Sequence, residues 1–105
     1  MDKNRGQALN DEFIKEIQDT LKRKNADYAT DTDILKNFKD AASIAGITPQ
    51  QGILFMIGIK VSRLGNLLSK DGSPVNEPIL DSVLDCAGYT MLLRNALFDK
   101  ESNKL

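Results

Sequence analysis

Apolar residues recur at helical spacing in four segments of the chain, and no segment shows the strict alternation typical of a strand. The longest apolar segment covers residues 48–70, TPQQGILFMIGIKVSRLGNLLSK, and contains no Asp or Glu. At 3.6 residues per turn, its apolar side chains surround nearly the whole helix, as in a helix at the centre of a domain. The pattern predicts an all-α protein in which the other helices cover this segment.

Capping residues indicate where the predicted helices begin and end. Thr48 is a favourable N-cap, Pro49 fits the first helical position, and Gln51 completes a capping box. Gly46 suits the end of the preceding helix. The predicted helices cover residues 10–24, from an N-cap at Asn10; 33–45, from a cap at Thr30 or Thr32; 48–70; and a last segment from a cap at Ser73 or Asn76 to residue 99.

The length of 105 residues predicts one domain. Four helices with short connections favour an antiparallel four-helix bundle over residues 10–99, with a disordered N-terminus at 1–9 and a disordered tail at 100–105. The two long helices carry more apolar surface than so short a chain can bury. We therefore expect a homo-oligomer, either a dimer or a larger assembly.

The composition argues against several classes of function. Fourteen Lys and Arg against 15 Asp and Glu give a net charge of -1, so we expect no long nucleic acid and no membrane as a partner. The chain has no histidine, which argues against zinc chemistry and Ser-His catalysis. The single cysteine, Cys86, is expected to be buried and reduced. There is no apolar signal core near the N-terminus, and Lys60 and Arg63 interrupt the apolar segment. These features predict a soluble cytoplasmic protein.

Charged residues within the two apolar helices form the first candidate site. Lys60 and Arg63 are neighbours on one face of the segment 48–70, while Asp81 and Asp85 share a face of the last helix, with Tyr89 one turn further on. Packed antiparallel, the two helices would neutralise each other's charges. Two interpretations stay open: a structural ion-pair network, or a network that also presents Lys60 and Arg63 to a ligand phosphate.

Two short pairs extend this candidate site. Asp27 can accept hydrogen bonds from a ribose or a base edge, and the ring of Tyr28 can stack on a base. Asn37 can read a base through its amide, next to Phe38. Taken singly, Tyr28 and Phe38 also fit a role in the core. The chain has no glycine-rich phosphate loop.

Taken together, these motifs resemble those of a group of small uncharacterised phage and prophage proteins, and more distantly the MazG-type all-α nucleoside triphosphate pyrophosphohydrolases. The resemblance covers residues 24–97. The motifs that carry it are Asp27-Tyr28, Asn37-Phe38, Ile47-Thr48-Pro49, Met56, Lys60, Arg63-Leu64, Asp81-Ser82, Asp85, Ala87-Gly88-Tyr89 and Leu92. It implies a four-helix, MazG-like oligomer with a nucleotide-sized pocket.

The chain departs from the pyrophosphohydrolase pattern at the metal site. The family holds Mg²⁺ between an ExxE pair and a later ExxD-like pair, since hard cations need several oxygen ligands. Lys60 and Arg63 stand where the first pair is expected. Of the second pair only Asp85 remains, because Asp81 is one residue out of register and Ser82 replaces the acid. The substitutions favour direct phosphate binding without a metal.

Three hypotheses follow. The first is a phage-type protein that captures a nucleotide or nucleotide-derived signal without cleaving it, as an inhibitor of host nucleotide-based defence would. It assigns no catalytic residue, no metal and no cofactor. The second is a divergent pyrophosphohydrolase with Mg²⁺ as its cofactor, held by Asp81, Asp85 and either Glu77 or Asp31. The third is a helical interaction module without ligand, whose charges fix helix register.

Overall fold

The computed structural model describes residues 1–27, 33–70, 72 and 75–99, except the side chains of 25–27. In these ranges the chain forms four helices and no strand, which confirms the all-α prediction. The helices are α1 (Lys3–Asp27), α2 (Lys36–Ala45), α3 (Pro49–Leu68) and α4 (Glu77–Phe98).

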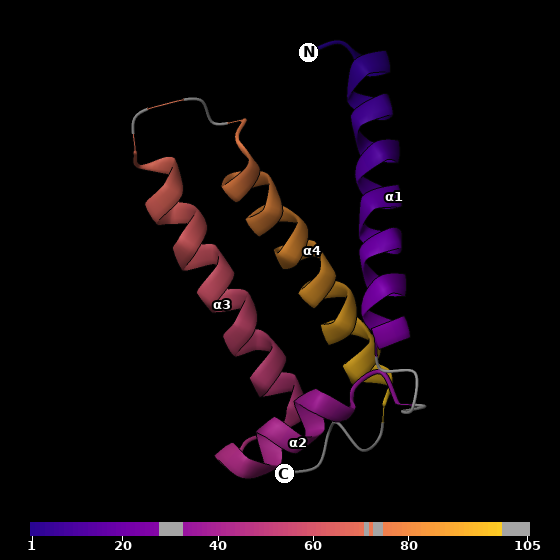
Figure 1. The fold of residues 1–105 in the computed structure, drawn as a ribbon, viewed down its shortest axis with the longest axis vertical. Helices are drawn as coiled ribbons and strands as arrows, with labels where there is room; N and C mark the ends of the chain where they lie inside the picture. The colour runs from indigo at the N-terminus through magenta and orange to yellow at the C-terminus, as the bar shows by residue number, and fades with distance from the viewer. Residues whose placement is uncertain (28–32, 71, 73–74, 100–105) are drawn as a thin grey trace.

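The helices α3 and α4 form an antiparallel hairpin, which is the main packing unit of the protein (Figure 1). Helix α1 packs on α4, runs in the same direction as α4, and approaches it towards their C-terminal ends. The short helix α2 crosses the base of the hairpin and packs on α3, with 95° between the α2 and α3 axes. One end of the hairpin is therefore closed by α2, while α3 and α4 diverge from α1 at the other.

Helix α1 begins seven residues earlier than the predicted N-cap at Asn10. Asp2 provides the cap, because its Oδ1 accepts a hydrogen bond from the backbone N–H of Arg5 at 2.8 Å. The segment predicted as a disordered N-terminus, 1–9, is thus helical from Lys3 onward. Asp and Asn cap helices about equally well, and the residues between Asp2 and Asn10 include no proline, so the helix extends to the earlier cap.

The corner between α2 and α3 matches the sequence prediction. Gly46 has a left-handed backbone conformation (φ 72°, ψ 30°), and the N–H of Ile47 donates to the carbonyl of Ala42 at 3.0 Å. The N–H of Gln51 donates to Thr48 Oγ1 at 3.2 Å, and the N–H of Thr48 donates to Gln51 Oε1 at 2.9 Å. These bonds complete the capping box and fix the direction in which α3 leaves α2.

The remaining helix ends differ from the predictions by a few residues. Helix α2 begins at Lys36, after a turn in which Asp33 Oδ1 accepts from the N–H of Leu35 at 2.9 Å. The proposed caps Thr30 and Thr32 lie outside the described residues. Of the two alternatives for α4, Asn76 is its N-cap and accepts from the N–H of Ile79 at 3.1 Å. Helix α3 ends at Leu68, two residues before the predicted end.

The buried core is small. In the described part of the chain, the buried hydrophobic side chains are Ile17, Leu35, Ala42, Ile53, Ile79 and Ala96. Around the cluster of Leu35, Ile53 and Ala96 pack the partly buried side chains of Phe38, Ile57, Tyr89, Leu92 and Leu93. The core therefore lies where α2, α3 and the C-terminal half of α4 meet.

The prediction that helix 48–70 is surrounded by the rest of the domain is wrong for much of its length. Ile53 is fully buried, but Leu54, Phe55, Val61 and Leu68 are each more than half exposed. Helix α3 packs mainly on α4 and, to a smaller extent, on α2. Cys86, expected to be buried, is half-buried.

In the described ranges no single helix is both long and apolar enough to cross a bilayer. The pair α2 and α3 reaches that length and composition only when taken together across its 95° bend.

Candidate ligand-binding site

The centre of the predicted charge cluster is an ion pair between α3 and α4. The Nζ of Lys60 lies 2.9 Å from Oδ2 of Asp85, and the two side chains are 23% and 32% exposed. The structure thus confirms that the cation inside the apolar helix is paired with an acid of the last helix. Because both groups keep some contact with water, the pair costs less desolvation than a fully buried one.

The second predicted pair does not form. Arg63 and Asp81 are both exposed, and in the described ranges no ion pair joins Arg63 to an acidic side chain. Three residues along a helix correspond to a rotation of about 300°, so Arg63 points about 60° away from the direction of Lys60. Its guanidinium is therefore accessible to a ligand, whereas the ammonium of Lys60 already has one acidic partner.

Tyr89 lies where three helices meet. Its ring packs edge-on against Phe38 of α2, with 6.1 Å between the ring centroids and 88° between the ring planes. Nζ of Lys24 from α1 lies 5.7 Å from the centroid of the same ring, in cation–π range. Tyr89 therefore holds α1 and α2 on α4.

The space beside Tyr89 and Asp85 is too small for a nucleotide. The cavity between α1 and α4 measures about 10 Å³ and is lined by Ile17, Thr20, Leu21, Lys24, Leu84, Asp85, Gly88, Tyr89 and Leu92. That volume corresponds to a single water molecule. Here the two residues contribute to helix packing, and this cavity does not hold a nucleotide.

A larger space lies between α2 and α3. An open groove of about 290 Å³ is lined by Asn37, Phe38, Ala41, Ala42, Ala45, Ile47, Gly52, Phe55 and Met56. Its walls are almost entirely apolar, and Asn37 is the one side chain among them with an amide. The size is at the lower end of the range for small-molecule sites. Sequence reasoning found Asn37 and Phe38 but missed the rest. The available signal was the alanines at 41, 42 and 45, which give α2 a smooth wall; Ala42 is the one that faces Gly52.

The groove and the two cations share one side of α3. Lys60 and Arg63 follow Met56 by four and seven residues, so they lie about 6 and about 10 Å further along the helix axis. Arg63 is only about 20° from Met56 around the axis, and Lys60 about 40°. Phe38 connects the groove to the charged region, since it lines the groove and also contacts Tyr89. The exposed guanidinium of Arg63 thus lies on the same side of α3 as the apolar groove, beyond its end at Met56.

The structure places the remaining predicted site residues as follows. Asn37 is exposed and lines the groove. Asp27 is the last residue of α1, with a side chain outside the described part. Tyr28 lies outside the described residues.

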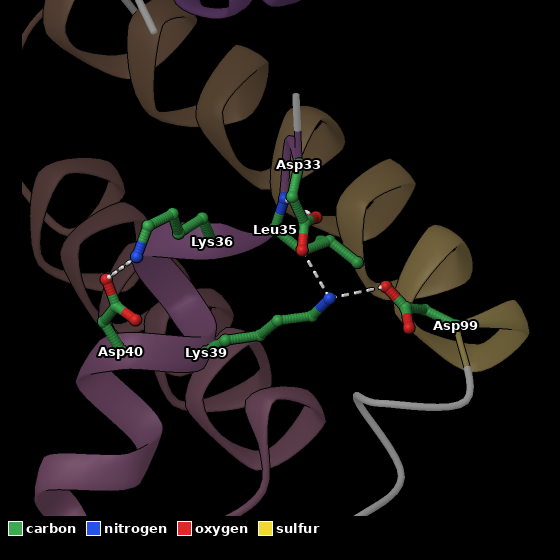
Figure 2. Close-up of polar contacts among 6 residues, drawn as sticks. All are labelled: Asp33, Leu35, Lys36, Lys39, Asp40 and Asp99. Carbon is green, nitrogen blue, oxygen red and sulfur yellow. Dashed lines mark hydrogen bonds and ion pairs between the residues drawn. The ribbon is translucent and has the colours of Figure 1, made fainter. Parts of the chain in front are cut away.

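A second charged cluster holds α2 in place (Figure 2). Nζ of Lys39 lies 2.5 Å from Oδ2 of Asp33 and 2.9 Å from Oδ2 of Asp99, just beyond the end of α4. On the same helix, Lys36 pairs with Asp40 at 2.8 Å. Lys39 therefore ties the wall of the groove to the end of the hairpin. The sequence offered no distinctive signal for this cluster, because Asp33 and Asp99 each fit a helix end.

The cluster shifts two pKa values. The hydrogen bond from Lys39, followed by the one from the N–H of Leu35, lowers the pKa of Asp33 below its ordinary value. The hydrogen bonds to Asp33 and then to Asp99 raise the pKa of Lys39. Both groups are therefore held in their charged forms over the neutral range.

In the part of the chain that the structure describes, no three acidic or cysteine side chains converge as a metal-binding group. Comparison of the chain with protein-family models, curated proteins and solved structures finds no match.

Proposed function

We propose that this protein captures a nucleotide or nucleotide-derived signal, with the base in the α2–α3 groove and a phosphate on Arg63. The observation that carries the proposal is the position of the apolar groove on the same side of α3 as Arg63 and Lys60. The ligand is bound without a metal and is not cleaved.

The groove suits the base. Phe38, Phe55 and Met56 supply apolar and aromatic surface, and the alanines of α2 leave room beside them. Bases stack on aromatic side chains with little dependence on sequence. The amide of Asn37 can both donate and accept a hydrogen bond, which is what recognition of a base edge needs. The groove thus offers stacking surface with one polar contact for orientation.

The two cations suit a phosphate in different ways. Arg63 is exposed and can bind phosphate oxygens in forked geometry, while Lys60 contributes a point charge that Asp85 partly compensates. The rise of about 10 Å from Met56 to Arg63 is spanned by a ribose, a phosphate chain and the arginine side chain together. We therefore assign Arg63 the larger share of the phosphate affinity.

The proposal includes the family-level interpretation of the sequence. A MazG-like bundle formed when the antiparallel α3–α4 hairpins of several copies pack together would cover the exposed apolar side chains of α3 and α4. The resemblance to phage and prophage proteins makes an inhibitor of host nucleotide-based defence, acting in the cytoplasm, the biological role that we propose. This role is supported by Lys60 and Arg63, which stand where the resembled pyrophosphohydrolases carry metal-binding acids.

Native mass spectrometry of the protein purified from cells tests the proposal. We expect an added mass equal to that of a nucleotide or a cyclic or linked nucleotide, retained in EDTA and lost in Arg63→Ala. Purified protein that carries no added mass, and acquires none from a panel of mono-, di-, tri- and cyclic nucleotides, would overturn the proposal.

A further inference from the structure

Helix α3 carries a second, uncovered stripe on the side away from the groove. Its residues are spaced four, three, four and three apart, which places them on one line along the helix. We call this stripe the α3 seam; it consists of Leu54, Gly58, Val61, Gly65 and Leu68. Leu54, Val61 and Leu68 are 58%, 56% and 58% exposed, an unusual state for large apolar side chains at heptad spacing.

The α3 seam is separate from the candidate nucleotide site. Leu54 lies about 160° around the helix axis from Met56 of the groove. The seam itself contains no charged residue, and Arg63 projects from the opposite side of the helix. A partner for this surface must therefore offer apolar rather than charged surface.

The two glycines of the seam would let a partner helix approach closely. A Cβ atom built on Gly58 or Gly65 meets no atom within 4 Å, so packing within the described part of the chain does not require a glycine at either position. Glycine lowers helix propensity relative to alanine, and neither residue has a positive φ. Small residues at heptad positions let two helix backbones come close together. The pattern is large–small–large–small–large, which supplies both knobs and holes.

The order of these residues identifies the partner. The two leucines of the seam lie symmetrically about Val61, since Leu54 and Leu68 are each seven residues away, and a glycine lies on either side, Gly58 three residues before Val61 and Gly65 four residues after it. A two-fold axis through Val61 would set Leu54 of one copy opposite Leu68 of the other. An isologous interface requires this self-complementarity. We infer that the α3 seam is a dimer interface in which α3 packs antiparallel on α3 of a second copy of this chain, about a two-fold axis at Val61.

The exposed surface of the chain is large enough for such an interface. Its accessible surface of 7741 Å² exceeds by about 1,900 Å² the roughly 5,800 Å² expected for a compact monomer of 11.6 kDa. Its radius of gyration is 15.8 Å, against about 13 Å for a compact domain of this length. A stable dimer buries about 800 Å² per partner. Leu80, Val83, Met91 and Leu97 of α4 are also exposed and add apolar area on the hairpin.

Disulfide cross-linking in a Cys86→Ser background tests the geometry. Val61→Cys lies on the proposed axis and should form a covalent dimer rapidly on oxidation, whereas Ser62→Cys, exposed and about 100° around the helix, should not. Leu54→Cys and Leu68→Cys should each stay monomeric alone and cross-link when the two variants are mixed. Cross-linking of Leu54→Cys with itself would indicate parallel helices and overturn the inference, as would equal yields from Val61→Cys and Ser62→Cys.

The glycines give a second test that does not depend on introduced cysteines. On an uncovered helix, Gly58→Ala with Gly65→Ala should raise the melting temperature, because alanine favours helix. In the proposed dimer the added methyl groups separate the helices and weaken self-association at least tenfold in sedimentation equilibrium. A stabilised variant with unchanged self-association would overturn the close packing.

The inference rests on the oligomeric part of the proposed function and not on nucleotide binding. A dimer cross-linked at Val61 that binds no nucleotide would remove the function and keep the interface. A protein that stays monomeric and binds nucleotide would keep the nucleotide-binding function and remove the interface.

Discussion

Lys60 of α3 and Asp85 of α4 form an ion pair, with 2.9 Å between Nζ and Oδ2. The pair lies in the most extensive helix–helix contact of the described structure, between α3 and α4. Three residues further along α3, Arg63 has no such acidic partner in the described ranges. The two cations of the apolar helix therefore have different roles. Lys60 fixes the register of the hairpin, and Arg63 is available to a ligand.

The first prediction concerns the energy of this ion pair. Lys60→Met and Asp85→Asn should each destabilise the protein, because each leaves a half-buried partner unpaired, and the double variant should be less destabilised than the sum. We expect a coupling energy of about 1 kcal/mol from urea denaturation of all four proteins. Strictly additive single effects would show that the pair does not hold the hairpin.

The second prediction concerns pH. The pKa of Asp33 is lowered, so its contribution to stability is present above about pH 4 and is lost as the pH falls through the folded-state pKa. The pKa of Lys39 is raised, so its contribution is present below about pH 10 and is lost as the pH rises through the folded-state pKa. The free energies of unfolding of wild type and Lys39→Met, obtained from thermal melts, should therefore differ most between these two pH limits, by less than about 1 kcal/mol.

A matched control for this pH effect is Lys22→Met, at an exposed position on α1. Its melting temperature should follow that of wild type at every pH. If Lys39→Met did the same, the cluster in Figure 2 would contribute nothing to the position of α2.

The third prediction concerns the corner that orients α2. Gly46→Ala forces a side chain into the left-handed conformation (φ 72°) and should destabilise the protein by about 1 kcal/mol. Ser43→Ala, at an exposed position inside the same helix, should be neutral or slightly stabilising because alanine favours helix. Chemical denaturation followed by circular dichroism checks both. Equal stabilities would contradict the corner geometry.

The fourth prediction concerns the groove. Ala41→Leu places a larger side chain at the groove wall and should lower nucleotide affinity at least tenfold, measured by calorimetry. Ser43→Leu adds the same side chain about 200° around α2, outside the groove lining, and should bind as wild type does. Both variants should keep wild-type helicity. If Ala41→Leu bound equally well, the base would have to lie elsewhere.

Local sequence signals predicted helix ends well wherever a capping residue bonds to backbone groups within one turn of itself. Thr48, Gln51, Gly46 and Asn76 all occupy their predicted positions, since capping depends on residues within one turn. The predicted start of α1 was wrong because Asp2 and Asn10 are equally suitable N-caps. Which of them caps the helix depends on whether residues 3–9 are helical.

Tertiary features were predicted only in part, because they depend on how the helices cross. Spacing along α3 and α4 correctly paired Lys60 with Asp85. Spacing could not show that Arg63 would be exposed and, in the described ranges, form no ion pair with α4. It also could not show that α2 would cross α3 at 95° and leave a groove beside Met56. The apolar residues all round α3 were interpreted as burial within one chain, whereas the structure leaves the α3 seam uncovered.

Isothermal titration calorimetry with a panel of mono-, di-, tri- and cyclic nucleotides in EDTA tests the central claim most directly. We predict binding of at least one nucleotide by the wild-type protein, and affinity at least tenfold lower in Arg63→Ala, since hydrogen bonds to charged groups contribute about 1.5–3 kcal/mol. Arg5→Ala, exposed in the first turn of α1, should bind like wild type. No heat with any nucleotide, or equal affinity in wild type and Arg63→Ala, would contradict the account.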